Sequence, residues 1–310
     1  MLIFANRKLQ ETVLSILIPT YEFDCSALVR GLVEQGRALR EAESDFSFEV
    51  LVADDGSSSA PRAALAAALP AADVRLLLPP HNVGRAAIRN LLVSEARGDS
   101  LLFVDDDAAL CTDDFLATYW QYRDAADVLC GSLRSPKKGS LDESGRELRL
   151  RYERRAFSRL TPAVRNRRPY DAFTAFNALF ARRVFDKVGF DERCRRYGHE
   201  DTLLGLELER NGFSVKHIEN PLIHTGIDTN AEFLQKTETA LQTLAEVGEP
   251  LQSRVATSRT YRRLRLLAPL FRLTHKLLRA PLRRNLLGTH PTLTNFQLYK
   301  FLFFSELMKK

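Results

Sequence analysis

The stretch LLFVDDDAAL, residues 101–110, follows four strongly apolar residues with three consecutive aspartates. The apolar run predicts a buried strand. Asp105, Asp106 and Asp107 carry like charges that repel one another and resist burial, so the fold must offset them. A divalent cation is one candidate, because Mg²⁺ and Mn²⁺ prefer carboxylate oxygens. A solvated acidic loop is the alternative interpretation of the same residues.

Short apolar runs alternate with helical patterns around this stretch, which is typical of a mostly parallel sheet flanked by helices. In open α/β sheets, ligands bind at the carboxyl ends of the strands, so we expect the polar strand ends to form one site. Strands are expected at residues 14–19, 48–55, 74–79, 101–106 and 127–132, and helices near 27–42, 59–69, 84–97 and 112–125.

The second half of the chain has a less regular pattern. Residues 134–170, rich in Arg, Lys, Ser, Gly and Pro, predict a loop-rich insertion or an acceptor-side segment. Regular structure is expected to resume with a strand at 176–181. A helix at 200–212, ending at Gly212, and a short strand at 213–218 should follow.

The overall composition is that of an ordinary globular protein, with 45% hydrophobic and 27% charged residues in 310. No apolar run is long enough to span a membrane, and the start of the chain lacks the features of a signal peptide, so a cytoplasmic location is expected. The cysteines are scattered without paired spacing and are expected to be free thiols. They are Cys25, Cys111, Cys130 and Cys194.

The net charge of +6 is unevenly distributed along the chain. Residues 251–310 hold 13 of the 45 Lys and Arg residues but one of the 39 Asp and Glu residues. Basic residues interleaved with Leu and Phe favour helices on a membrane surface, drawn to anionic lipids. Helices packed on the rest of the chain, with a solvated basic face, are the alternative. Pro269 and Pro281 are expected to divide them, and without a nucleic-acid motif we expect no nucleic-acid partner.

Two further strand ends carry polar residues. VADDGSSS, residues 52–59, ends a predicted strand in an acidic pair and also suits a turn with Ser57 or Ser58 at the start of a helix. HNVGRAAIRN, residues 81–90, offers an asparagine, a turn glycine and two arginines at a helix start suited to anions. Each segment alone is equally compatible with a structural turn.

Five segments occur together in the order and spacing of the family 2 glycosyltransferases, which are inverting, nucleotide-sugar-dependent enzymes with the GT-A fold. The resemblance covers about residues 13–226. It implies a Rossmann-like α/β catalytic domain at 1–248 and a basic helical C-terminal extension at 249–310. The segments are SILIPTYEF (15–23), VLVADDGSSS (50–59), HNVGRAAIRN (81–90), LLFVDDDAAL (101–110) and RYGHEDTLLGLEL (196–208).

The resemblance assigns the nucleotide donor to residues at several strand ends. The first-strand motif lines the nucleoside pocket, the acidic pair holds base and ribose, and the Asn-x-Gly segment with its following arginine completes the donor side. One departure is Glu22, which stands where the family usually has Asn. The residues so assigned are Pro19, Tyr21, Asp54, Asp55, Asn82, Gly84, Arg89, Asp105 and, in the variable middle of the acidic triplet, Asp106.

The resemblance also implies a metal site and a catalytic base. Asp105 and Asp107 match the Asp-x-Asp element, and His224 resembles a late histidine that can complete the Mn²⁺ or Mg²⁺ site. Asp201 matches the base that deprotonates the acceptor hydroxyl, and Glu200 would contact the acceptor or support that base. Alternatively, the two acidic residues only favour the start of a helix through its dipole.

These assignments predict a metal-dependent inverting glycosyltransferase. The resemblance implies a UDP-sugar donor, a glycan or lipid-linked acceptor hydroxyl, and a role in cell-surface polysaccharide synthesis, with the enzyme peripheral on the cytoplasmic face of a membrane. A sugar-nucleotide pyrophosphorylase is an alternative, but PTYEFD (19–24) lacks the glycine-rich, Arg-containing loop that such an enzyme needs after its first strand. A non-catalytic module that binds nucleotide sugars or membranes is a third interpretation.

Overall fold

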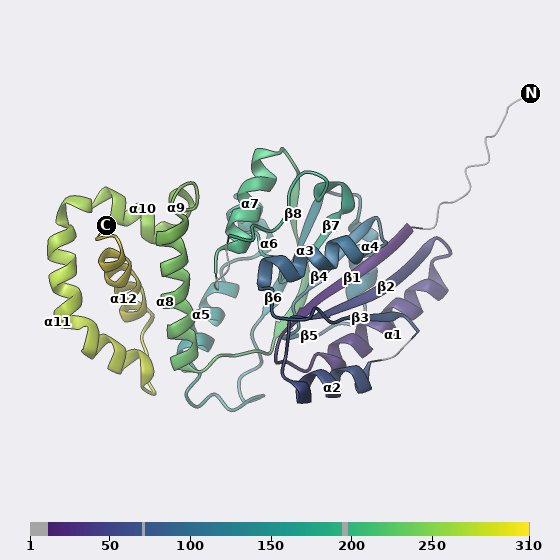
Figure 1. Cartoon of the computed structure of the whole chain (residues 1–310), viewed down its shortest axis with the longest axis horizontal. Coiled ribbons are helices and arrows are strands. Elements are labelled where there is room, and N and C mark those ends of the chain that lie inside the picture. The colour runs from purple at the N-terminus through teal and green to yellow at the C-terminus, as the bar shows by residue number, and fades with distance from the viewer. Residues whose placement is uncertain (1–11, 70–71, 194–197, 310) are drawn as a thin grey trace, which may run out of the picture.

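A computed structural model describes residues 12–69, 72–193 and 198–309, so Cys194 and Tyr197 lie outside the described residues. Eight strands form one sheet in the order β3-β2-β1-β4-β7-β6-β8-β5 (Figure 1). The strands are β1 (Thr12–Thr20), β2 (Phe46–Asp54), β3 (Val74–Leu77), β4 (Ser100–Val104), β5 (Ala108–Leu110), β6 (Val128–Arg134), β7 (Asn177–Ala181) and β8 (Val215–His224).

The first four strands of the chain are parallel, as the sequence predicts. β1 pairs with β2 and β4, and β2 pairs with β3. β7 then runs antiparallel to both β4 and β6, while β8 runs parallel to β6 and antiparallel to β5. The sheet is therefore mixed, and the carboxyl ends of β1, β2 and β4 lie side by side at one edge.

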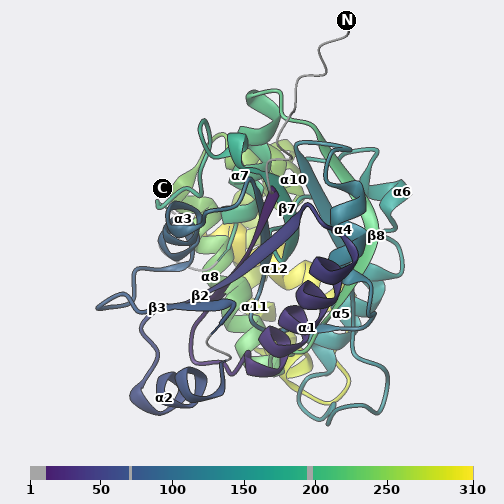
Figure 2. The same cartoon turned by 90° about the vertical axis from the view of Figure 1, so that its right-hand side faces the viewer.

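Helices cover both faces of the sheet, which is why the strands are apolar along their length. Ile16 and Ile18 of β1 pack into the core under α1 and α4, whereas Leu17 faces the core under α3 and α7. Figure 2 shows these two pairs of helices on opposite sides of β1 and β2. The helices are α1 (Ser26–Ala42), α2 (Ser59–Ala68), α3 (Arg85–Glu95), α4 (Phe115–Tyr122) and α7 (Glu200–Arg210), with a 3₁₀ turn η1 (Arg182–Val184).

The segment predicted to be loop-rich contains two helices, α5 (Glu147–Phe157) and α6 (Pro162–Arg165), so that expectation is wrong for these residues. Leu148 and Leu150 of α5 are buried, but the same face also buries the carboxylate of Glu153. A charged residue on the inward face breaks the apolar period from which a helix is predicted. β8 likewise continues past the expected end at 218 as far as His224.

Five helices and a 3₁₀ turn at the other end of the molecule follow β8 (Figure 1). The first begins at a capping box, in which Thr229 and Glu232 satisfy each other's backbone N–H groups. Pro269 lies in the first turn of a helix, at a boundary as predicted. The same helix runs through Pro281, so the prediction is wrong there; Pro281 is exposed, and the carbonyl left without a helix donor can be hydrated. The elements are α8 (Asn230–Val247), α9 (Leu251–Arg254), α10 (Ala256–Arg263), η2 (Arg265–Leu267), α11 (Ala268–Leu287) and α12 (Leu293–Leu307).

These helices pack on the preceding part of the chain through two apolar clusters, each with members on both sides of residue 248. Leu206 of α7 and Leu244 of α8 share one cluster with Phe304 of α12. Leu148 of α5 shares the other with Tyr299 of α12. The extension thus has a buried side, as in the alternative of helices packed on the rest of the chain.

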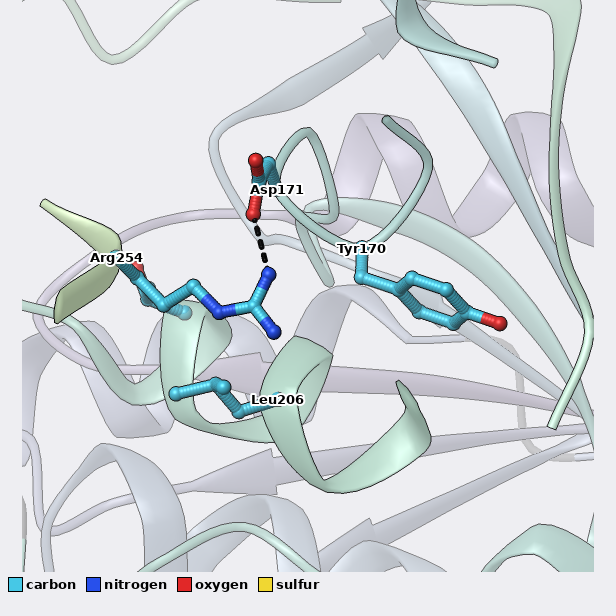
Figure 3. Close-up of a pocket in the computed structure, with 5 residues that line it drawn as sticks. Tyr170, Asp171, Leu206 and Arg254 are labelled. Atoms are coloured by element: carbon cyan, nitrogen blue, oxygen red, sulfur yellow. Dashed lines mark hydrogen bonds and ion pairs between the residues drawn. The ribbon is translucent and has the colours of Figure 1, made fainter. Parts of the chain in front are cut away.

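An ion pair adds to this packing. Arg254 of α9 pairs with Asp171 at 2.9 Å (Figure 3). It also pairs with Glu209 of α7. A cavity of about 30 Å³ beside the pair has room for about one water, so it is no ligand site. It is lined by Tyr170, Asp171, Thr202, Leu206 and Arg254.

Two expectations from composition are met within the described residues. No helix in this part of the chain is both long and apolar enough to cross a bilayer. Cys25, Cys111 and Cys130 are free thiols.

Phe304→Ala should test the packing of the extension. The Phe304 ring is fully buried in the cluster that α12 shares with α7 and α8. Truncation should therefore lower the free energy of unfolding by about 3–5 kcal/mol. Leu298→Ala on the same helix is the control, because Leu298 is 38% exposed and should cost under about 0.5 kcal/mol. Equal costs in urea denaturation would show that α12 does not pack as described.

Candidate active site

The acidic triplet forms a tight turn at the end of β4. The backbone N–H of Asp105 donates to the carbonyl of Phe176, and the N–H of Ala108 donates back to the carbonyl of Asp105. β5 then begins, and its register with β8 sets Ala108 opposite His224. The turn therefore carries Asp107 to the end of β8, although 117 residues separate it from His224.

Asp105 is neutralised by two arginines of α3. Arg89 donates to it at 2.6 Å, and the guanidinium of Arg85 lies 3.5 Å from its other oxygen. Burial opposes the charge of Asp105, but the two arginines outweigh it, and the pKa of this carboxyl is lowered. Arg89 is 2% exposed, so its charge acts on Asp105 with little screening by water.

Asp107 is neutralised by His224. The His224 Nε2 lies 3.0 Å from Asp107 Oδ2, and His224 Nδ1 lies 2.8 Å from Glu153 Oε1. Burial disfavours the imidazolium, but the two carboxylates outweigh it and raise the pKa of His224 to about 9. Gly226 makes room for this arrangement, because a Cβ there would lie 2.4 Å from Asp107 Oδ2.

Asp106 has no such cation. It accepts a hydrogen bond of 3.3 Å from the backbone N–H of Tyr21. Burial, with the neighbouring charge of Asp107, raises the pKa of Asp106 to about 7. A proton can therefore remove the third negative charge near neutral pH.

Glu153 is a site residue that the sequence reasoning missed. It lies on α5, in the segment expected to be loop-rich, and is 2% exposed between His224 and Arg149. A hydrogen bond from His224 Nδ1 to Glu153 directs the Nε2 atom toward Asp107. The contact joins residues 71 positions apart, so no local pattern could have indicated it.

Asp107 and His224 fit a divalent ion once Nε2 of His224 gives up its proton, because a ligating imidazole must be neutral. Within the described ranges, no three His, Cys, Asp or Glu side chains are grouped to hold a metal. One carboxylate and one imidazole nonetheless suffice for Mn²⁺ or Mg²⁺ when substrate phosphates and waters complete the shell. The structure brings Asp107 and His224 together, whereas Asp105 pairs with Arg89. The roles of Asp105, Asp107 and His224 as metal ligands stay predictions.

Glu200 and Asp201 occupy the first turn of α7, where the helix dipole favours carboxylates. Arg85 donates to Glu200 at 2.9 Å and so connects α7 to Asp105. Asp201 Oδ2 accepts from the Thr174 hydroxyl at 2.9 Å, while its buried Oδ1 has no hydrogen-bond partner among the described residues. Burial, reinforced by the charge of Glu200, raises the pKa of Asp201 to about 6.

The acidic pair on β2 organises the neighbouring loops. Asp55 accepts from the N–H groups of Val83 and Gly84, and its carbonyl accepts from the Asn82 side chain. Gly84 has φ +92°, a conformation that favours glycine, just before α3 begins. Asp54 is likewise held, by the Ser57 N–H and by Arg62. Their contact with base and ribose stays a prediction.

The departure at Glu22 has a structural consequence. Its backbone is left-handed, at φ +53°, and its carboxylate accepts from both the N–H and the hydroxyl of Ser58. Ser58 is the residue before α2, so Glu22 connects the end of β1 to that helix start. Beside it, Pro19 is buried and Tyr21 is 55% exposed, open to a ligand.

The family model of glycosyl transferase family 2 matches residues 15–189. The chain belongs to glycosyl transferase family 2. This membership identifies it as a glycosyltransferase and sets aside the pyrophosphorylase and the non-catalytic module. No curated protein matches the chain.

Solved structures similar to this family 2 glycosyltransferase confirm the GT-A fold. A mannosyltransferase from Pyrobaculum calidifontis, in complex with GDP-Man and Mn²⁺, is 14% identical, with a TM-score of 0.55 over 95% of this chain and 85% of that one. S. aureus TarS 1–349 with UDP is 17% identical, with a TM-score of 0.50 over 96% and 90%.

Glucosyl-3-phosphoglycerate synthase from Mycobacterium tuberculosis, with Mn²⁺, UDP and glucosyl-3-phosphoglycerate, is 15% identical, with a TM-score of 0.50 over 77% of this chain and 82% of that one. The chain covers 42% of a longer TarS structure. At 14–17% identity, these structures show that the chain shares their fold and nothing more.

Glu153→Gln should lower the pKa of His224 from about 9 toward its ordinary 6.5, because the anionic partner of Nδ1 is lost. NMR titration of the imidazole would measure the shift. Glu143→Gln is the control, since Glu143 pairs with Arg154 of the same helix and does not contact His224. An unchanged His224 pKa in Glu153→Gln would contradict the contact.

Proposed function

We propose that this protein is a metal-dependent inverting glycosyltransferase that moves a sugar from a UDP-sugar to a hydroxyl of a glycan or lipid-linked acceptor in cell-surface polysaccharide synthesis. The carrying observation is the Asp201 carboxylate, which has one unpartnered oxygen and a pKa raised to about 6. A general base with a pKa near the working pH is suited to removing the proton of a hydroxyl.

The donor class is supported by the acidic cluster and by the structural relatives. Three of the similar structures are complexes with a nucleotide or nucleotide sugar, two of them with Mn²⁺. In this chain, Asp107 and His224 would hold Mn²⁺ or Mg²⁺, with Glu153 fixing the imidazole. When bound, the metal supplies Lewis-acid stabilisation of the negative charge on the departing diphosphate.

The remaining residues around the acidic turn are proposed to position the nucleotide donor. Arg89 is buried and bound to Asp105, so we propose that it holds this carboxylate in place beside the donor. Pro19, Tyr21, Asp54, Asp55, Asn82 and Gly84 would line the nucleoside side. Tyr21 also donates to Asp106 through its backbone, which connects this side to the acidic turn.

The chemistry at the acceptor follows from the contacts of Asp201. The Thr174 hydroxyl bonds one carboxylate oxygen and leaves the other for the acceptor O–H. The acceptor oxygen attacks the anomeric carbon, its proton passes to Asp201, and the bond to the diphosphate breaks on the opposite face. A single displacement of this kind inverts the anomeric configuration. Glu200, held by Arg85, would fix the start of α7 and so the direction of Asp201.

A lipid-linked acceptor would place the enzyme at the cytoplasmic face of a membrane. The basic extension supports this proposal, because anionic lipids attract clustered Lys and Arg.

Asp201→Asn should reduce turnover by about 10²- to 10⁴-fold with little loss of donor affinity, because the amide cannot accept the proton. In the unsubstituted enzyme, the pKa of Asp201 predicts that kcat/KM falls as pH drops below about 6, where the carboxylate becomes protonated. Radiolabelled sugar transfer and calorimetric donor titration would measure both effects. Asp124→Asn, at a side chain 91% exposed, is the control. Full turnover in Asp201→Asn would exclude Asp201 as the base.

A further inference from the structure

α11 presents a row of leucines to solvent. Leu266, just before the helix, is 89% exposed, and Leu270, Leu273 and Leu277 are 56%, 55% and 69% exposed. Steps of four, three and four residues put these side chains on one face of a helix. We call this set the leucine face.

The leucine face is not a poorly packed part of the core. The opposite side of α11 is already buried, through residues such as His275, Leu282 and Leu286, which pack toward α12 and the catalytic domain. α11 lies at the end of the molecule away from the sheet (Figure 1). The helix therefore has two apolar sides, and the protein's own fold uses one.

The surroundings of the leucine face carry one sign of charge. No Asp or Glu occurs between Glu249 and Glu306. Three of the basic side chains in this range are paired: Arg254 with Asp171 and Glu209, Arg262 with Glu249, and Arg283 with Glu238. Within the described part of the chain, six others on or just before α11 make no ion pair: Arg263, Arg265, Arg272, Lys276, Arg279 and Arg284.

We propose that the leucine face docks on an anionic lipid bilayer. An amphipathic helix with leucines on one side and Arg or Lys beside them lies in the interface plane, with the apolar side chains among the acyl chains. Cations on the same side of the helix, such as Arg284 seven residues after Leu277, then meet the negatively charged lipid phosphates.

A second copy of the chain fits this face less well. The leucine spacing resembles the apolar seam of a coiled coil. Pairing two leucine faces would, however, bring basic flanks together without a single acidic residue on α11 of either copy. Like charges that meet across an interface oppose association. Charge complementarity thus favours an anionic surface as the occupant.

This docking extends beyond the proposed reaction, because it depends on α11 and the residues just before it and holds for any activity of the catalytic domain. It identifies the face, the lipid charge and the orientation: α11 toward the bilayer, with the catalytic domain on the side of α11 that faces α12.

The test is co-sedimentation of the full chain with vesicles of phosphatidylcholine, with and without phosphatidylglycerol. We expect binding to the anionic vesicles, weakened by salt, and at least a ~10-fold loss of affinity in L273S/L277S. The matched control is L78S/L160S, which replaces two leucines of 49% and 45% exposure outside the extension. Unchanged thermal melting would show that each variant is folded.

Equal vesicle binding by L273S/L277S and the unsubstituted chain would overturn the proposal. So would a dimer, seen by analytical ultracentrifugation, that L273S/L277S dissociates while neither form binds vesicles, since a second copy would then be the occupant. Sugar transfer to a water-soluble acceptor separates the two proposals: vesicle binding without transfer would leave the docking face intact and contradict the proposed function.

Discussion

The partial burial of three adjacent carboxylates at the end of β4 is the constraint on which the rest of the site depends. Each negative charge is offset differently: Asp105 by the arginines of α3, Asp107 by the imidazolium of His224, and Asp106 by a pKa raised to about 7. Because an unpaired buried charge is costly, these partners fix the positions of the elements that carry them. Arg85 extends the network to α7, and Glu153 extends it to α5.

The same network connects the two halves of the proposed reaction. In that proposal Asp107 and His224 would contact the donor and Asp201 the acceptor, and the ion pairs of Arg85 with Asp105 and Glu200 lie between them. A change in charge at the acidic turn should therefore change the pKa of Asp201, the proposed base, because the charges of Glu200 and Asp105 both raise it. The helices of the extension pack against α7 through a shared apolar cluster and expose the leucine face on their other side.

The sequence predicted those elements that a short run of neighbouring residues is enough to indicate. The apolar strands, the acidic strand ends and the acidic start of α7 are all found, and His224 does meet Asp107. The sequence did not reveal α5, because Glu153 interrupts its inward apolar face. The short β5 and the pairing of Glu153 with His224 depend on contacts far apart in the chain. Pro281 was overrated as a breaker because its exposed position lets water satisfy the freed carbonyl.

The central claim is that the acidic turn and His224 bind a nucleotide sugar together with a divalent ion. A thermal-melting panel of nucleotide sugars, each with and without Mn²⁺, tests it most directly, since a ligand that binds the folded state raises the melting temperature. We predict that a UDP-sugar raises the melting temperature, and that the rise is larger with Mn²⁺ than without it. No shift from any nucleotide sugar, with Mn²⁺ or Mg²⁺ present, would contradict the claim.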